Sequence, residues 1–370
     1  MRLAIVGPTH PYKGGVAQHT TRLAHQLAAA GNEVELVSWS AQYPKLLYPG
    51  QQKVAIPEQP VFPRTSYSLS WRWPFGWWRT GRRLSREADA VVLVLVTPVQ
   101  APALATIARA LRGRARTIVL CHNVLPHERR AVDKGLVRSL LSRVDAVLVH
   151  AESEAATARS LTDVQVVTSP LPPPLLFATG SDVPSAVGRP VVHSLLFFGI
   201  VRPYKGLDVL LHALKETPDV RLVVRGEFWG GSEHTRALLS ELGIADRVDL
   251  REGYVAAEEV PVLFASADAL VLPYRTSTAS WNASLGHEHG IPVVATRVGT
   301  MAEQVRDGVD GLLCEPDDPT ALAACLRRLY EPGVLEDLRA QVRAPPGDKQ
   351  WAAYVEVVEH IAEKREGSAP

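Results

Sequence analysis

Two cations stand close together in one loop of the second half of the sequence. Arg202 and Lys205 follow the apolar run LLFFGI, which is typical of a buried strand, and precede a helical pattern over Leu207–Lys215. A guanidinium can grip a diphosphate with two parallel hydrogen bonds, and an ammonium acts beside it as a point charge. The pair therefore indicates an anion site. The alternative is two solvated loop cations.

A second loop carries hydroxyl groups directly after another apolar run, ALVLP. Its sequence is YRTSTAS, residues 274–280, and a short helical stretch follows it. The hydroxyls and the free N–H groups of a helix start, here at Ser277–Ser280, suit a phosphate group. An ordinary helix N-cap would need only one of these residues.

The first loop of the chain contains a glycine pair. Gly14 and Gly15 lie between the apolar run LAIVG and a helical pattern over residues 16–31. Glycine lets the backbone approach a ligand, and the helix start offers amides to an anion. The loop matches neither GxGxxG nor GxxxxGK[ST], so neither a nicotinamide fingerprint nor a P-loop is present. A plain turn explains the pair equally well.

The segment HNVLPHE could supply a general base. His127 and Glu128 could accept a proton from an acceptor hydroxyl. A surface turn built on Pro126 is an equally plausible interpretation.

No metal site is predicted. His287 and His289 flank Glu288, but histidines two residues apart do not share a helix face. The pair Asp317–Asp318 precedes a helical pattern and is expected to cap it rather than to act as a metal-binding DxD motif. The three cysteines are far apart and form no CxxC, which argues against a cysteine zinc site and a disulfide-stapled module.

The elements that must position these loops alternate along the chain. Apolar runs alternate with helical patterns in both halves, which indicates parallel sheets covered on both faces. A proline- and glycine-rich stretch, residues 170–190, separates the halves. The strand candidates are LAIVG, VELVSW, AVVLVLV, TIVLC and AVLVH in the first half, and LLFFGI, RLVVRG, RVDLREG, ALVLPY, PVVAT and GLLCEP in the second.

We therefore predict an α/β protein with two tandem doubly wound, Rossmann-like domains and a cleft between them. The expected boundaries are residues 1–175 and 190–345. In such domains ligands bind at the carboxyl ends of the strands, which is where the three loops lie.

Composition limits the class of protein. The 370 residues include 40 Lys and Arg against 39 Asp and Glu, and the formal net charge of +1 argues against a nucleic-acid partner. No apolar run approaches the ~18 residues of a membrane-spanning helix. Pro8 and Pro11 interrupt the amino terminus, which is not a signal peptide by this criterion. A reduced, cytoplasmic location fits the cysteine usage.

Four segments together resemble the retaining glycosyltransferases of family 4. They are FFGIVRPYKG, PYRTSTAS, GIPVVATRVGT and DGVDGLL, and they occur in the family's order and spacing. The GGV loop and HNVLPHE also look like this family, so the resemblance spans essentially the whole chain. It implies a GT-B fold, a nucleoside-diphosphate sugar as donor substrate, and no separate cofactor. It also implies that the final helix, residues 350–366, crosses back onto the first domain.

The resemblance implies roles for individual residues. Arg202 and Lys205 would bind the donor diphosphate and stabilise the leaving group. The loop of Gly14 and Gly15 would approach the phosphate or the transferring sugar. His122 would contact the reacting sugar or the acceptor, unless it is a loop histidine bonded to backbone.

Glu227, in the segment RGE, occupies a position where such enzymes often meet the nucleoside. The alternative is a solvated carboxylate at a strand end.

One motif departs from the family. Many members carry a Glu-x7-Glu pair that contacts the donor sugar and ribose, and its positions here hold Ser277 and Leu285. A branch with a Ser/Thr-rich loop also lacks the pair and looks most similar, although Trp281 stands where that branch usually has glycine. Trp281 would line the donor pocket or pack against the neighbouring strand. We expect Ser280 to contact the donor, and Glu288, one helical turn beyond Leu285, to take over the ribose contact.

The resulting prediction is a metal-independent, retaining glycosyltransferase. It would move a sugar to a hydroxyl on a polysaccharide or lipid-linked intermediate or on a natural product, with cations and helix-start amides stabilising the departing diphosphate. The altered glutamate pair favours an alternative, a catalytically silent GT-B protein that binds a glycan or supports a partner enzyme. A glycosyl phosphorylase is a further alternative.

Residues 70–87, SWRWPFGWWRTGRRLSRE, are the most unusual stretch of the first half. Four tryptophans alternate with arginines on an expected amphipathic helix, which suits peripheral contact with the inner face of an anionic membrane. The alternative is that the tryptophan face packs on the sheet and the arginine face is solvated. Nucleic acid also suits this composition, but the near-neutral net charge argues against it.

Overall fold

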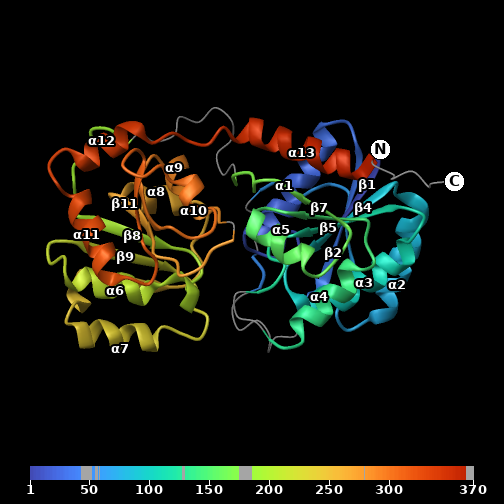
Figure 1. The fold of residues 1–370 in the computed structure, drawn as a ribbon, viewed down its shortest axis with the longest axis horizontal. Coiled ribbons are helices and arrows are strands. Elements are labelled where there is room, and N and C mark those ends of the chain that lie inside the picture. The colour runs from blue at the N-terminus through green and yellow to red at the C-terminus, as the bar shows by residue number, and fades with distance from the viewer. Residues whose placement is uncertain are drawn as a thin grey trace. The chain divides into compact units, whose positions relative to one another are not determined.

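The computed structural model describes residues 1–42, 52–54, 57, 59–126, 130–174, 186–278 and 280–363. The chain divides into two compact α/β units, whose elements are labelled in Figure 1. Unit 1 comprises Met1–Pro172 and Asp348–Pro370, and unit 2 comprises Pro173–Gly347. Each unit has a sheet covered by helices on both faces, which confirms the predicted doubly wound class.

Unit 1 contains, within the described residues, a seven-stranded sheet of order β3-β2-β1-β4-β5-β6-β7. Neighbouring strands pair in parallel, and Ile5 at the centre pairs with Leu36 on one side and Val92 on the other. The strands are β1 (Arg2–Val6), β2 (Glu33–Ala41), β3 (Thr65–Ser70), β4 (Ala90–Leu95), β5 (Arg116–Cys121), β6 (Ala146–Val149) and β7 (Gln165–Thr168). β4 is buried along its whole length, as expected for a central parallel strand.

The helices of unit 1 cover both faces of this sheet. In Figure 1, α3 lies between α2 and α4, and α13 lies along α1. The described helices of the unit are α1 (Gly15–Ala29), α2 (Pro74–Glu87), α3 (Ala101–Leu111), α4 (Asp133–Leu141), α5 (Glu152–Arg159) and α13 (Gly347–Glu363), with a short 3-10 turn at Pro98–Gln100.

The last helix, α13, belongs to unit 1 because its apolar stripe is buried there. Trp351, Tyr354, Val358 and Ile361 recur at helical spacing and are at most 1% exposed. Asn32, just past α1, donates a 2.5 Å hydrogen bond to Glu359.

Unit 2 contains a six-stranded parallel sheet of order β10-β9-β8-β11-β12-β13 in the described part of the chain. Its strands are β8 (Ser194–Phe198), β9 (Arg221–Gly226), β10 (Val248–Glu252), β11 (Ala269–Leu272), β12 (Val293–Thr296) and β13 (Gly311–Cys314). Its helices are α6 (Leu207–Lys215), α7 (Glu233–Leu242), α8 (Val260–Ala265), α9 (Asn282–Glu288), α10 (Met301–Gln304), α11 (Pro319–Leu329) and α12 (Val334–Gln341), with 3-10 turns at Pro203–Lys205 and Ala245–Arg247.

The predicted strands are confirmed, but two strands of the structure were not predicted. β3 and β7 lie at the two edges of the unit 1 sheet, where polar and partly exposed residues replace the continuous apolar run. The prediction that all of residues 70–87 forms one helix is wrong for its first four residues. Pro74 occupies the first turn of α2, where its missing N–H costs nothing, and so the helix begins there.

A buried ion pair ties α12 to the core of unit 2. Arg339 and Asp268 approach to 2.6 Å, with side chains 2% and 0% exposed. Asp268 also accepts hydrogen bonds from the backbone amides of Val192 and Ser194 and from the Tyr330 hydroxyl. This carboxylate is therefore well satisfied only while Arg339 neutralises its charge.

We predict that Arg339→Met lowers the free energy of unfolding by about 3–5 kcal/mol, because it leaves a buried carboxylate without its counter-charge. Chemical denaturation of the full chain measures this. The matched control is Arg251→Met, which breaks an exposed pair with Asp249 and should change stability by less than about 1 kcal/mol. Equal losses in the two variants would contradict the role given to burial.

Candidate functional site

The candidate site of unit 2 lies at the carboxyl ends of β8 and β11. Arg202 precedes the 3-10 turn Pro203–Lys205, which leads into α6 through Gly206. Gly206 has φ +65°, and a Cβ there would lie 2.0 Å from the carbonyl oxygen of Pro273, after β11. A side chain cannot fit at this position, so the glycine allows the two strand-end loops to meet.

Lys205 lies among aromatic and amide groups. Its Nζ is 5.2 Å from the centre of the Tyr274 ring. Asn282, at the start of α9, donates to the Tyr274 hydroxyl at 2.8 Å and to the Phe198 carbonyl at 3.2 Å. Ser280 accepts a hydrogen bond from the Asn282 amide at 3.3 Å. These contacts bring Lys205 and Ser280, which the sequence predicted, together with Tyr274 and Asn282, which it did not.

No carboxylate among the described residues pairs with Lys205. Burial lowers the pKa of Lys205, and the nearby Arg202 guanidinium also lowers it. A buried ammonium is stabilised when an anion binds beside it, because the charge of the anion replaces the hydration that burial removed.

Arg202 stacks on an aromatic ring that sequence reasoning missed. Its guanidinium carbon is 4.2 Å from the centre of the Trp229 ring. The loops after β8 and β9 are joined by backbone hydrogen bonds from Val201 to Glu227 and from Trp229 back to Val201. Glu227 therefore lies in the loop beside Arg202, half-buried. The tryptophan in RGEFWGG was the signal available in the sequence.

Arg275, the cation within the hydroxyl-rich loop, is engaged by the protein itself. It donates two hydrogen bonds to Asp208 at 2.8 and 2.7 Å and one to Asp317 at 2.7 Å. These carboxylates raise the pKa of Arg275 further above its usual value. Asp318 caps α11 as predicted, whereas Asp317 pairs with Arg275.

Helix α9 separates the remaining donor-side candidates. Leu285 and Glu288 are each 5% exposed, and Leu285 packs in the core of unit 2. Glu288 lies six residues from Asn282, about 9 Å along the helix axis. The structure thus groups Ser280 with Lys205 and buries Glu288 at the opposite end of α9; its ribose contact stays a prediction. Trp281 is half-buried at the start of the helix.

The carboxyl edge of the unit 1 sheet carries a second group of candidates. Gly14, with φ +97°, precedes α1, and the space around its Cα is open. His122 directly follows β5, and its Nε2 has no hydrogen-bond partner among the described residues. Its ring lies 4.9 Å from that of His19 on α1 and 5.0 Å from that of His150 after β6. His127 and Glu128 lie outside the described residues.

The three imidazoles form a packed cluster. Burial lowers the pKa of His19 and His122 well below the usual value, and that of His150 to about 4. His150 Nδ1 lies 3.2 Å from the Ser169 carbonyl oxygen. These lowered pKa values keep the rings neutral at pH 7, so His122 is available for hydrogen bonding. Within the described residues, no three His, Cys, Asp or Glu side chains are arranged to hold a metal ion.

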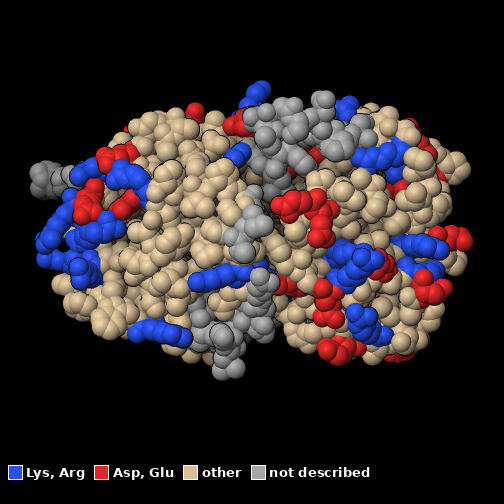
Figure 2. All heavy atoms as spheres, turned by 180° about the vertical axis from the view of Figure 1, so that it is seen from behind, with Lys and Arg blue, Asp and Glu red and all other residues tan. Residues whose placement is uncertain are grey.

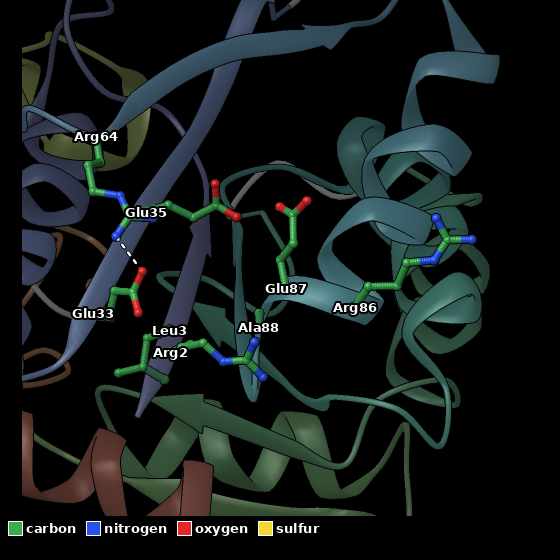
Figure 3. Close-up of a pocket in the computed structure, with 8 residues that line it drawn as sticks. All are labelled: Arg2, Leu3, Glu33, Glu35, Arg64, Arg86, Glu87 and Ala88. Atoms are coloured by element: carbon green, nitrogen blue, oxygen red, sulfur yellow. Dashed lines mark hydrogen bonds and ion pairs between the residues drawn. The ribbon is translucent and has the colours of Figure 1, made fainter.

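A cavity of about 280 Å³ lies at the amino ends of β1 and β2 (Figure 3). Arg64 pairs there with Glu33 at 2.8 Å, and Arg2 pairs with Asp89. This edge of the sheet is opposite the carboxyl ends where doubly wound domains bind ligands, and we assign it no function.

Two family models match the chain. The model described as Glycosyltransferase Family 4 matches residues 13–170, and the model described as Glycosyl transferases group 1 matches residues 192–332. Between them they cover most of both units.

Curated proteins match shorter regions. D-inositol 3-phosphate glycosyltransferase from Xylanimonas cellulosilytica is 32% identical over 55% of this chain and 50% of that protein. The same enzyme from Acidothermus cellulolyticus is 31% identical over 39% and 35%. A GDP-mannose-dependent alpha-(1-6)-phosphatidylinositol monomannoside mannosyltransferase from Mycolicibacterium smegmatis is 33% identical over 44% and 43%. The matched regions thus span about a third to a half of these relatives' length.

Solved structures are similar over nearly the whole chain. Sucrose-phosphate synthase from Thermosynechococcus elongatus has a TM-score of 0.73 at 17% identity, covering 98% of this chain and 99% of that chain. HepE from Anabaena in complex with UDP has a TM-score of 0.68 at 16% identity, covering 97% and 100%. At such identities the likeness shows the fold alone.

We predict that Lys205→Met raises the melting temperature of the free protein while removing its stabilisation by pyrophosphate. The variant no longer carries the desolvation cost of a buried ammonium. A resulting gain of about 1 kcal/mol in the free energy of unfolding would raise the melting temperature by about 2–4 °C. Differential scanning fluorimetry with and without pyrophosphate measures both effects. Lys215→Met, on the exposed side of α6, is the matched control and should change neither. A variant that keeps the pyrophosphate shift would contradict an anion site at Lys205.

We predict that acidification destabilises unit 1 through its histidine cluster. The folded-state pKa of His150 is about 4, below the unfolded value of about 6.5, so the unfolded chain binds more protons between these values. Stability should fall by about 3 kcal/mol from this residue as the pH drops from 6.5 to 4. His150→Gln, whose amide can still donate to Ser169, should show a smaller loss in urea unfolding at each pH. An identical pH profile would rule out this contribution.

Proposed function

Because the chain belongs to glycosyltransferase family 4, we propose that it transfers a sugar from a nucleoside-diphosphate sugar to a hydroxyl acceptor. The observation that carries this proposal is the cation pair of unit 2. Arg202 lies against Trp229, and Lys205 lies against Tyr274, beside the amide of Asn282. The donor is a substrate here, and no separate cofactor is invoked.

Charge development explains why such a site would accelerate the transfer. As the bond from the anomeric carbon to the diphosphate oxygen breaks, negative charge grows on the phosphate. Lys205 is already desolvated, and both cations are held by their ring contacts, so they stabilise this charge with little reorganisation. Two fixed cations can neutralise the leaving group without a metal ion, and we propose that they do so.

We further propose that the anomeric configuration is retained. The acceptor hydroxyl would then attack from the face that the diphosphate leaves, and the departing phosphate oxygen would take its proton. The sequence resemblance to retaining enzymes supports this step. The loop of Gly14 and Gly15 would provide backbone amides to the reacting groups.

The acceptor is proposed to bind the carboxyl edge of unit 1. His122 offers a neutral, unpartnered Nε2 that can accept a hydrogen bond from a hydroxyl. The names of the relatives include inositol 3-phosphate and phosphatidylinositol monomannoside, which supports a polyol or lipid-linked acceptor. We place Glu227 and Glu288, as a proposal, on the nucleoside side of the donor.

The free thiols of Cys121, Cys314 and Cys325 support a reduced, cytoplasmic location.

The second candidate is a catalytically silent binding protein. Ser277 and Leu285 occupy the positions of the family's usual glutamate pair, and Leu285 is a core residue. Such a protein would bind nucleotide or glycan without turnover.

The test begins with thermal shifts against UDP, GDP, dTDP and ADP, each with and without magnesium. One nucleotide should stabilise the protein, by about 2.7 kcal/mol at a hundredfold excess over its Kd. Arg202→Ala should abolish the shift, whereas Arg328→Ala, an exposed arginine of α11, should keep it. The donor sugar of that nucleotide is then supplied with inositol phosphate and phosphatidylinositol acceptors, and the product anomer is read by NMR.

Binding followed by a retained glycoside would establish the transferase. A shift that requires Arg202 but leads to no transfer or donor hydrolysis would favour the silent protein. No shift with any nucleotide would overturn the donor site.

A further inference from the structure

An exposed aromatic surface lies where β3 passes into α2. Trp71, Trp73, Phe75 and Trp78 are 37%, 63%, 61% and 47% exposed. We call this surface, together with the arginines between and beside them, the Trp–Arg patch. Its members are Trp71, Arg72, Trp73, Phe75, Trp78, Arg79 and Arg82.

The tryptophans of this segment do not form one face that packs on the sheet. Trp77 alone among these four packs against the core of unit 1, and it donates a hydrogen bond to the Ser70 carbonyl at 2.8 Å. The core-facing side of α2 is instead made by small residues and Leu84, and a Cβ on Gly81 would lie 2.7 Å from Ala110 of α3. Close packing on small residues leaves the large aromatic side chains outside. The alternative interpretation, a tryptophan face packed on the sheet, is therefore wrong for three of the four tryptophans.

The arginines of α2 divide into two groups. Arg83 is paired within the unit, with Glu35 at 3.0 Å and with Glu87. Arg72 and Arg82 lie instead over the rings of Trp71 and Trp78, at 5.4 and 5.6 Å. With Arg79, they have no carboxylate partner in the described part of the chain.

The patch is cationic as well as aromatic. Residues 71–82 contain no Asp or Glu. Figure 2 shows Lys and Arg side chains interleaved with Asp and Glu at one end of unit 1. Positive side chains without counter-charges, set among exposed indoles, suit a surface that is both anionic and apolar.

We propose that the Trp–Arg patch docks unit 1 on an anionic phospholipid bilayer. Indole rings settle at the level of the lipid headgroups with their N–H groups hydrated, and the arginines meet the headgroup phosphates. None of the described helices is long and apolar enough to cross a bilayer, so this contact is peripheral.

The patch lies at the same edge of the sheet as the candidate site of unit 1, which gives the docking a purpose. The strands are parallel, so the turn after β3 lies at the same edge as Gly14 and His122. The Tyr67 hydroxyl of β3 donates to the His10 carbonyl in the loop after β1. His122 follows β5, four strands from β3, which is about 19 Å. This orientation brings the carboxyl edge of unit 1 toward the bilayer surface. The purpose rests on the proposed function, whereas the docking itself does not.

The test is sedimentation of the full chain with vesicles of phosphatidylcholine alone or mixed with phosphatidylglycerol. The protein should bind the mixed vesicles, less so as salt rises, with a blue shift of tryptophan fluorescence. Arg79→Gln/Arg82→Gln should weaken binding about 25-fold, from about fivefold for each arginine. The matched control, Lys134→Gln/Arg138→Gln on the exposed side of α4, should bind as the wild type does.

The aromatic half of the patch is tested separately. Trp73→Ser/Phe75→Ser/Trp78→Ser should lose vesicle binding and the fluorescence shift. Val99→Ser/Val132→Ser, which changes exposed apolar residues elsewhere in unit 1, should keep the binding. Nucleotide thermal shifts of all variants should match the wild type, which separates this proposal from the donor site.

Three outcomes would overturn the docking proposal. The wild type could fail to bind mixed vesicles, or the control variants could lose as much binding as the patch variants. The wild type could also form a dimer that the patch variants do not form, which would make the patch an interface between copies of this chain.

Discussion

Parallel pairing of the strands is the constraint on which the rest of this molecule depends. It collects the loops after β8, β9 and β11 at one edge of unit 2, and those after β1, β3, β5 and β6 at one edge of unit 1. Residues far apart in sequence, such as His19, His122 and His150, meet for this reason. Glycines such as Gly206 then let the loops close without steric conflict.

The cations of the protein are divided by whether the fold neutralises them. Arg275 and Arg339 pair with carboxylates and hold loops or helices in place. Arg202 stacks on Trp229, and Lys205 lies beside the Tyr274 ring, which orients a cation without cancelling its charge. The same distinction separates Arg83 from Arg82 on α2. A charge that the fold does not neutralise, such as that of Lys205, costs stability and provides affinity for an external anion.

Much of the fold was readable because central parallel strands are continuously apolar, as AVVLVLV and TIVLC are. The edge strands β3 and β7 were missed because one of their sides faces no neighbouring strand and tolerates polar residues. In the candidate site, Arg202, Lys205 and Ser280 were visible from their types and positions. Trp229, Tyr274 and Asn282 were not, since each acts through a contact with a partner distant in sequence.

The sequence by itself determined the class, the two-unit organisation and the family, because these follow from periodicity and from short motifs whose residues are neighbours in the chain. The tertiary structure decided which of the candidate residues are spent on the fold. It placed Leu285 in the core of unit 2, tied Arg275 to Asp208, and left Trp73 and Arg79 on the surface. Burial and pairing depend on packing between segments that sequence spacing does not encode.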